Sequence, residues 1–308
     1  MLRDDILRRR DGLRLYGLTP PKRGQDPDKV RDIADRQARR IAALAPDGLV
    51  LYDLQDEAGR TEAARPFPFL PTLEPLDYSR DYLAALEVPR VLYKCVGNQT
   101  AAELLAWVDA LEAGAGRVAC VLVGAPTSAG VQGAGALGLS AAYDLLRARG
   151  AQPCLGGVAI AERHARKLDE DERLFRKHAS GCRFFISQTV FDAGATKSLL
   201  SDYALAFARA AQQPVPFILS FSPCGSLKTM EFMKWLGISF PRWLENDLRH
   251  APDILRKSVD LALQIFADVR AFAKEKGIPL GINVESVSIR KEEIEASGEL
   301  FASLSARM

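Results

Sequence analysis

Short apolar runs alternate with longer segments of helical periodicity along the whole chain. The short runs have the length and the β-branched or aromatic content of buried strands. Eight such runs are predicted as strands: Leu13–Thr19, Gly48–Leu54, Arg90–Val96, Arg117–Gly124, Leu155–Ala161, Cys182–Val190, Val215–Phe221 and Ile278–Ser286. Helices are predicted at Asp28–Leu44, Ala101–Ala113, Leu139–Arg149, Asp169–His178, Lys197–Ala211, Leu227–Leu236, Asp253–Lys276 and Lys291–Ser303.

This alternation predicts an α/β fold, a (β/α)8 TIM barrel formed by a single domain over residues 1–308. An open, doubly wound sheet is the alternative. Closure is favoured because an open sheet of this size would leave two edges to cover. A long, proline-rich loop at 54–81 follows the second strand, and loops of this length are usually functional. With Arg60, Arg65, Phe67 and Phe69 it is predicted to form a lid over a flat aromatic ligand or a partner surface.

Composition is that of an ordinary globular protein, with 48% hydrophobic and 26% charged residues. The 41 basic and 39 acidic residues give a net charge of +2, which does not favour a nucleic-acid surface. No apolar run approaches the roughly 18 residues of a membrane span, so we expect a cytoplasmic protein that does not enter the membrane. The sequence leaves a homo-oligomer or a partner subunit open. The five widely spaced cysteines suggest free thiols, and no histidine pair has the spacing of metal ligands.

The stretch Leu155–Asp192 contains most of the candidate chemistry. It is predicted as strand, charged loop, helix and strand, with Glu162 and His164 after the first strand and Gln188 near the end of the second. Ligand-binding groups gather at the carboxyl ends of parallel strands. Ser187 and Gln188 interrupt an apolar run, and a buried amide without partners costs about 1–3 kcal/mol. Gln188 is therefore predicted to bind a ligand.

A glycine-rich segment at 133–138 fits the spacing G-x-G-x-x-G. Its first glycine lies about nine residues beyond the preceding strand, whereas a dinucleotide fingerprint begins in the tight turn itself. The spacing favours a flexible loop. A phosphate cradle at the start of the following helix remains open.

These motifs together resemble the methylenetetrahydrofolate reductase family, which consists of flavin-binding (β/α)8 barrels that reduce methylenetetrahydrofolate to 5-methyltetrahydrofolate. The resemblance covers nearly the whole chain. It rests on Glu162-Arg163-His164 for the family's E-x-H, Glu170 and Lys177 in the following helix, Ile186-Ser187-Gln188-Thr189-Val190-Phe191-Asp192 for I-T-Q-F-F-F-D, Pro20-Pro21 after the first strand and Pro223 after the seventh.

The resemblance implies FAD as cofactor, NADH or another electron donor, a folate as substrate and a place in one-carbon metabolism and methionine biosynthesis. It assigns Lys177 to the flavin phosphates, Glu170 to the ribose and His164 to the phosphate or adenosine portion. Gln188 would reach the flavin ring or the pterin. Tyr93, which replaces a family histidine on the third strand, is assigned to cofactor binding. Leu227, which replaces an aromatic residue that contacts nicotinamide or folate, is assigned to substrate binding.

Two family carboxylates are missing from this chain. Gly17 stands where the first strand carries a glutamate that helps to protonate the pterin, and the aspartate after the fourth strand is also absent. Because strand eight neighbours strand one in a closed barrel, Glu285 is the preferred replacement as catalytic acid. The alternative is that Glu285 pairs with Arg290 or Lys291.

Three functions follow from the sequence. The first is a divergent, flavin-dependent reductase of methylenetetrahydrofolate. The second is a folate-binding or methyl-transfer partner protein that has lost flavin. The third is a barrel for another substrate, with Lys94 and Glu285 as a base and acid pair.

Overall fold

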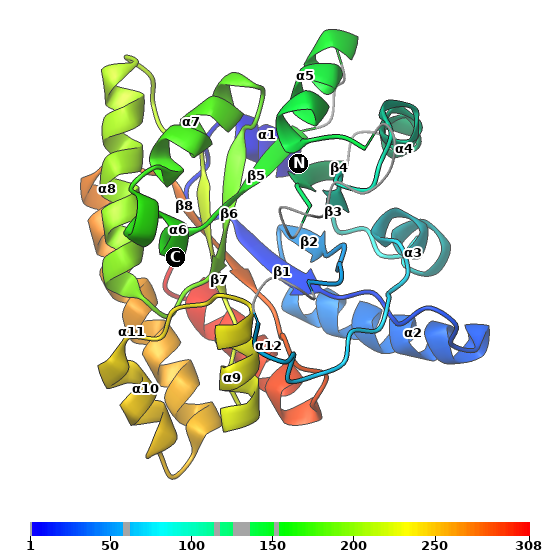
Figure 1. The fold of residues 1–308 in the computed structure, drawn as a ribbon. Coiled ribbons are helices and arrows are strands. Elements are labelled where there is room, and N and C mark those ends of the chain that lie inside the picture. Colours follow the sequence, from blue (N-terminus) through cyan, green and yellow to red (C-terminus); the bar gives the residue numbers. More distant parts are fainter. Residues whose placement is uncertain (1, 58–61, 114–117, 126–135, 151–153) are drawn as a thin grey trace.

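The computed structural model describes residues 2–57, 62–113, 118–125, 136–150 and 154–308. Eight parallel strands form a closed barrel in the order β1 to β8, which confirms the predicted (β/α)8 fold (Figure 1). The strands are β1 (Arg14–Leu18), β2 (Gly48–Leu51), β3 (Arg90–Cys95), β4 (Val118–Val123), β5 (Cys154–Ala159), β6 (Phe184–Thr189), β7 (Phe217–Phe221) and β8 (Leu280–Val284). Each lies within or at the edge of its predicted run.

Helices surround the strands, as Figure 1 shows. They are α1 (Leu2–Leu7), α2 (Pro27–Leu44), α3 (Pro75–Tyr82), α4 (Ala101–Ala113), α5 (Leu139–Arg149), α6 (Ala161–Lys167), α7 (Glu170–Ala179), α8 (Ala193–Arg209), α9 (Leu227–Trp235), α10 (Arg242–Arg249), α11 (Ile254–Glu275) and α12 (Lys291–Ser305). Side-chain oxygens of Asp26, Asp192, Ser226 and Asp253 accept hydrogen bonds from the first turns of α2, α8, α9 and α11, which fixes where these helices begin.

Alternate strand residues form two separate apolar clusters. The outer cluster packs between strands and helices, and the inner cluster fills the barrel with residues such as Leu15, Val91 and Ile186. Leu2 and Ile6 of α1 join the inner cluster, so this helix closes the amino end of the barrel. Gly48 permits the contact, because a Cβ there would lie 2.6 Å from Cδ2 of Leu2.

Helix α6 was predicted as a loop, and α1 was not predicted. The inward side of α6 carries the polar residues Glu162 and His164, both buried, so the helix lacks the apolar periodicity that marks a buried face. His164 bonds to Asp202 of α8 instead, with Nε2 3.0 Å from Oδ2.

The segment after β2 lies against α9, as Figure 1 shows for its blue to cyan trace. Trp235 of α9 donates from Nε1 to the carbonyl of Ala63 at 3.0 Å, and Lys22 forms an isolated bridge with Thr72. Among the residues that the structure describes, no helix is both long and apolar enough to cross a membrane.

Candidate functional site

Polar side chains gather inside the barrel near the carboxyl ends of its strands. Asn283 lies on β8, Glu285 directly after it, Tyr52 after β2, Tyr93 on β3 and Thr189 at the end of β6. Tyr52 and Tyr93 form a ring pair with centroids 4.8 Å apart. We call these five residues the lumen cluster. They place a carboxyl, an amide and three hydroxyls at the end of the barrel where (β/α)8 proteins bind ligands.

Glu285 is the acidic member of the lumen cluster. The hydroxyls of Tyr52 and Thr189 hydrogen-bond to its carboxyl, Thr189 at 3.3 Å. Burial raises the pKa of Glu285 to about 7, and these two hydrogen bonds offset part of the burial effect. Glu285 can therefore change protonation state near neutral pH, as a general acid or base requires.

The pairing of Glu285 with a neighbouring cation, which the sequence left open, does not occur among the described contacts. Arg290 lies 3.9 Å from Glu292, and Lys291 lies 3.6 Å from Glu295. The Glu285 side chain turns toward the barrel interior instead.

Gly17 makes room for Glu285 on the neighbouring strand. The β1–β8 register pairs Tyr16 with Val284, which brings Gly17 beside Glu285. A Cβ on Gly17 would lie 3.0 Å from Cβ of Glu285 and 2.9 Å from Cε2 of Tyr52. The carboxyl of Glu285 thus enters the lumen beside Gly17, the position at which the resembling family has a glutamate.

Two amide oxygens near the lumen have no hydrogen-bond partner within the described part of the chain. Asn283 is fully buried and donates from Nδ2 to the hydroxyls of Tyr52 (2.7 Å) and Ser220 (3.1 Å), which leaves Oδ1 unpaired. Gln188 donates from Nε2 to the carbonyl of Leu236 at 2.8 Å, which leaves Oε1 unpaired. Because a buried, unpaired acceptor is unfavourable, both oxygens are suited to a ligand that carries N–H donors.

The three residues assigned to the flavin dinucleotide lie in the layer between helices and strands. Lys177 donates to the carbonyl of Val158 at 2.6 Å, and burial lowers the pKa of its ammonium group. Glu170 is fully buried and accepts from Arg163 at 2.8 Å and from the backbone of Ile160 at 3.2 Å. His164 bonds to Asp202, as described above. These side chains are engaged by the protein and do not fit a dinucleotide site in this structure.

Two further candidates lie away from the lumen cluster. Lys94 points outward from β3, with its ammonium 3.3 Å from Glu74 and above the ring of Trp107. It therefore does not face Glu285, and the structure does not bring this base and acid pair together. Leu227 begins α9 and is 45% exposed.

Arg65 lies in the segment after β2, among aromatic rings. Its guanidinium carbon lies 5.2 Å from the ring centroid of Phe69, 5.5 Å from Phe232 and 5.0 Å from Trp235. We call this arrangement the Arg65 cradle. The side chain is 19% exposed, and its Nε and Nη1 are buried without a hydrogen-bond partner in the described residues. Arg60 of the same loop, and Gly133 to Gly135 of the glycine-rich segment, lie outside the described residues.

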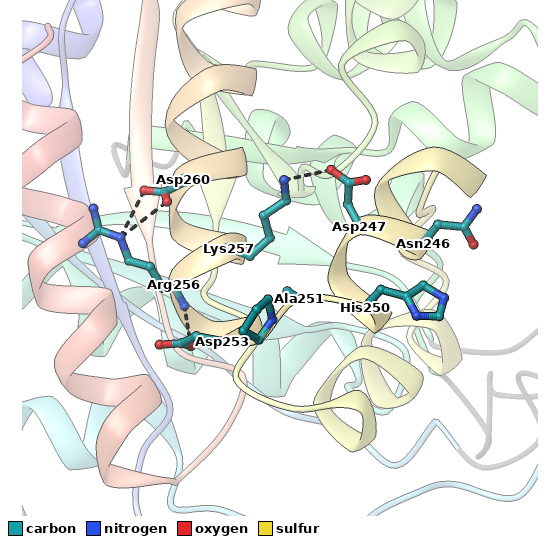
Figure 2. Close-up of a pocket in the computed structure, with 9 residues that line it drawn as sticks. Asn246, Asp247, His250, Ala251, Asp253, Arg256, Lys257 and Asp260 are labelled. Carbon is teal, nitrogen blue, oxygen red and sulfur yellow. Dashed lines mark hydrogen bonds and ion pairs between the residues drawn. The ribbon is translucent and has the colours of Figure 1, made fainter.

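A surface hollow of about 650 Å³ lies between α10 and α11 (Figure 2). Its charged side chains pair with one another, Lys257 with Asp247 at 2.8 Å and Arg256 with Asp260 at 3.3 Å. None of the residues predicted from the sequence to form the site line this hollow. None of its lining residues is among the described side chains that have a buried polar atom without a hydrogen-bond partner.

Sequence reasoning named Glu285, Gln188 and Tyr93 but missed Asn283, Tyr52 and Thr189. Asn283 is a polar residue within the apolar eighth strand, which is the same signal that singled out Gln188. Tyr52 and Thr189 gave no comparable signal, because tyrosine and threonine are common in strands.

Comparisons with solved structures find proteins of similar fold. The chain is similar to an uncharacterized protein from Clostridium thermocellum that binds two copies of 5-methyl-5,6,7,8-tetrahydrofolic acid, with 42% identity, a TM-score of 0.86 and all of both chains covered. Dihydropteroate synthase from Xanthomonas albilineans has 14% identity and a TM-score of 0.47, with 98% of this chain and 97% of that chain covered. 2,3-Dimethylmalate lyase has 12% identity and a TM-score of 0.46, with 92% and 79% covered.

The two distant likenesses carry no argument about function. No family model matches the chain, and no curated protein matches it. The first likeness extends over both full lengths at 42% identity, and the chain therefore belongs to the same family as the Clostridium thermocellum protein.

Proposed function

We propose that this protein binds a reduced folate of the 5-methyltetrahydrofolate type at the lumen cluster and acts in one-carbon metabolism. The observation that carries the proposal is the full-length, 42% identical relative that binds this ligand. The lumen cluster supports it, because it offers hydrogen-bond acceptors and a titratable acid at the carboxyl end of the barrel.

A pterin ring suits these groups chemically. Its pyrimidine edge carries N–H donors, which match the unpaired Oδ1 of Asn283 and Oε1 of Gln188. The rings of Tyr52 and Tyr93 offer apolar and aromatic surface to a flat heterocycle. Glu285, with a pKa of about 7, would exchange a proton with a pterin nitrogen when a one-carbon unit is gained or lost.

Calorimetric titration with 5-methyltetrahydrofolate tests the proposal. We expect the wild type to bind. Asn283→Ala should bind about tenfold more weakly, because it loses one hydrogen bond to the ligand. Glu285→Gln should lose the pH dependence of binding around neutrality. Arg256→Met, in the surface hollow, is the matched control and should bind like wild type. Binding that is unaffected in both lumen variants, or that is lost in Arg256→Met, would place the ligand elsewhere and overturn the assignment.

Reduction of methylenetetrahydrofolate is a second candidate, favoured by the position of Glu285 beside Gly17. The resembling family uses an acid on the first strand to protonate the pterin, and here the neighbouring strand supplies one. The residues assigned to FAD do not fit it, so flavin use and the electron donor stay predictions. The absorbance spectrum of the purified protein and an assay for 5-methyltetrahydrofolate formation test them. A colourless protein that binds folate without turnover would favour the flavin-free, methyl-transfer alternative.

A further inference from the structure

The Arg65 cradle holds a positive charge whose ion pair with Asp56 is long. The guanidinium lies among three aromatic rings at 5.0 to 5.5 Å. Its nearest recorded carboxylate, Asp56, is 3.9 Å away and half exposed, and Nε and Nη1 have no hydrogen-bond partner in the described residues. Because a desolvated cation is stabilised by an anion with matching hydrogen-bond geometry, this environment favours a bound carboxylate.

A second cation lies beside the cradle. The ammonium of Lys228 lies 4.6 Å above the ring of Phe67, and this ring packs edge-on against Phe232 at 5.3 Å. Arg65 and Lys228 thus provide two positive charges beside one acidic residue, Asp56. Two cations next to partly buried aromatic rings suit a ligand in which an aromatic ring is joined to a chain with two carboxylates.

The cradle is connected to the lumen cluster through α9. Trp235 bonds to Ala63 of the loop, and the next residue, Leu236, accepts a hydrogen bond from Gln188 at 2.8 Å. Gln188 precedes Thr189, which bonds to Glu285. These hydrogen bonds link the interior of the barrel to the Arg65 cradle.

We infer that Arg65 and Lys228 bind the glutamate carboxylates of the folate, while the aromatic rings of the cradle contact its benzoyl group. This inference rests on the proposed function and assigns the part of the ligand that the lumen cluster does not hold. It makes the segment after β2 a determinant of ligand choice, because only folates that carry the glutamate tail would engage it.

A comparison of two ligands tests the inference. 5-Methyltetrahydropteroate has the pterin and the aromatic ring of 5-methyltetrahydrofolate but lacks the glutamate, so it ends in one carboxylate on the ring where the folate ends in two on the glutamate. We expect the wild type to bind the glutamate-bearing ligand about 10- to 100-fold more tightly, since this is the usual worth of hydrogen bonds to charged groups. In Arg65→Met this preference should fall to about twofold or less, because the glutamate-bearing ligand loses more affinity than the pteroate. Lys228→Met, at an exposed position, should lower the preference partially without disturbing the cradle.

The control is Arg80→Met, which removes an exposed arginine of α3 that pairs with Asp81 at 2.7 Å and should retain the full preference. Equal binding of both ligands by the wild type would overturn this inference and leave the proposed function standing. Equal weakening of both ligands in Arg65→Met, with Lys228→Met like wild type, would show that Arg65 only supports the loop. If the wild type bound neither ligand, the proposed function would fail and this inference with it.

Discussion

Glu285→Gln should flatten the dependence of stability on pH. Burial moves the pKa of Glu285 from 4.5 to about 7, so the folded protein holds this proton more tightly than the unfolded chain. The stabilising effect of the proton is fully present below about pH 4.5 and is lost as the pH rises through about 7. At about 1.4 kcal/mol for each unit of pKa shift, ionisation of Glu285 would lower the free energy of unfolding by about 3 kcal/mol. Partial solvent contact of the carboxyl reduces this loss to about 1–3 kcal/mol.

Urea unfolding followed by circular dichroism, at several pH values between about 5 and about 8, measures this difference. The wild type should lose about 1–3 kcal/mol more stability than Glu285→Gln over that range. Burial also raises the pKa values of Asp53 and Glu162, but these groups are present in both proteins and cancel in the comparison. Stability curves that run parallel for the two proteins would refute the reasoning, because they would mean that Glu285 ionises alike in the folded and unfolded chain.

Two further substitutions test whether the ligand lies in the lumen or in the layer between helices and strands. Gly17→Ala should destabilise the protein by about 1–3 kcal/mol and weaken folate binding, because its Cβ would lie 2.9 Å from the Tyr52 ring; a thermal melt and a binding titration check this, and unchanged values would contradict the close packing. Lys177→Met should change stability but leave folate affinity within about twofold, because the ammonium bonds to Val158 in the helix layer. A tenfold or larger loss of affinity would instead return Lys177 to the ligand site.

Much of the fold could be predicted from the sequence, because periodicity reports local burial. The predicted helices at Ala101–Ala113 and Leu139–Arg149 coincide with α4 and α5. Barrel closure also placed strand eight beside strand one, and the observed register brings Glu285 next to Gly17.

The direction of individual side chains could not be predicted in the same way. His164 follows a strand as a ligand-binding residue would, yet it faces Asp202 of α8. The register shift between Ile186 and Thr189 interrupts the alternation of β6 and brings Thr189 to Glu285, and no sequence pattern marks that shift. Arg65 was recognised only as part of a loop, because its contacts with Phe232 and Trp235 span more than 160 residues of chain.

Helix α1 covers the amino end of the barrel. Leu2 and Ile6 pack into the amino end of the barrel, so a molecule held at the lumen cluster would arrive and leave at the carboxyl end. Any second protein that takes up or delivers the one-carbon unit would then have to approach the carboxyl end, where it would meet the loop after β2 and the end of α9.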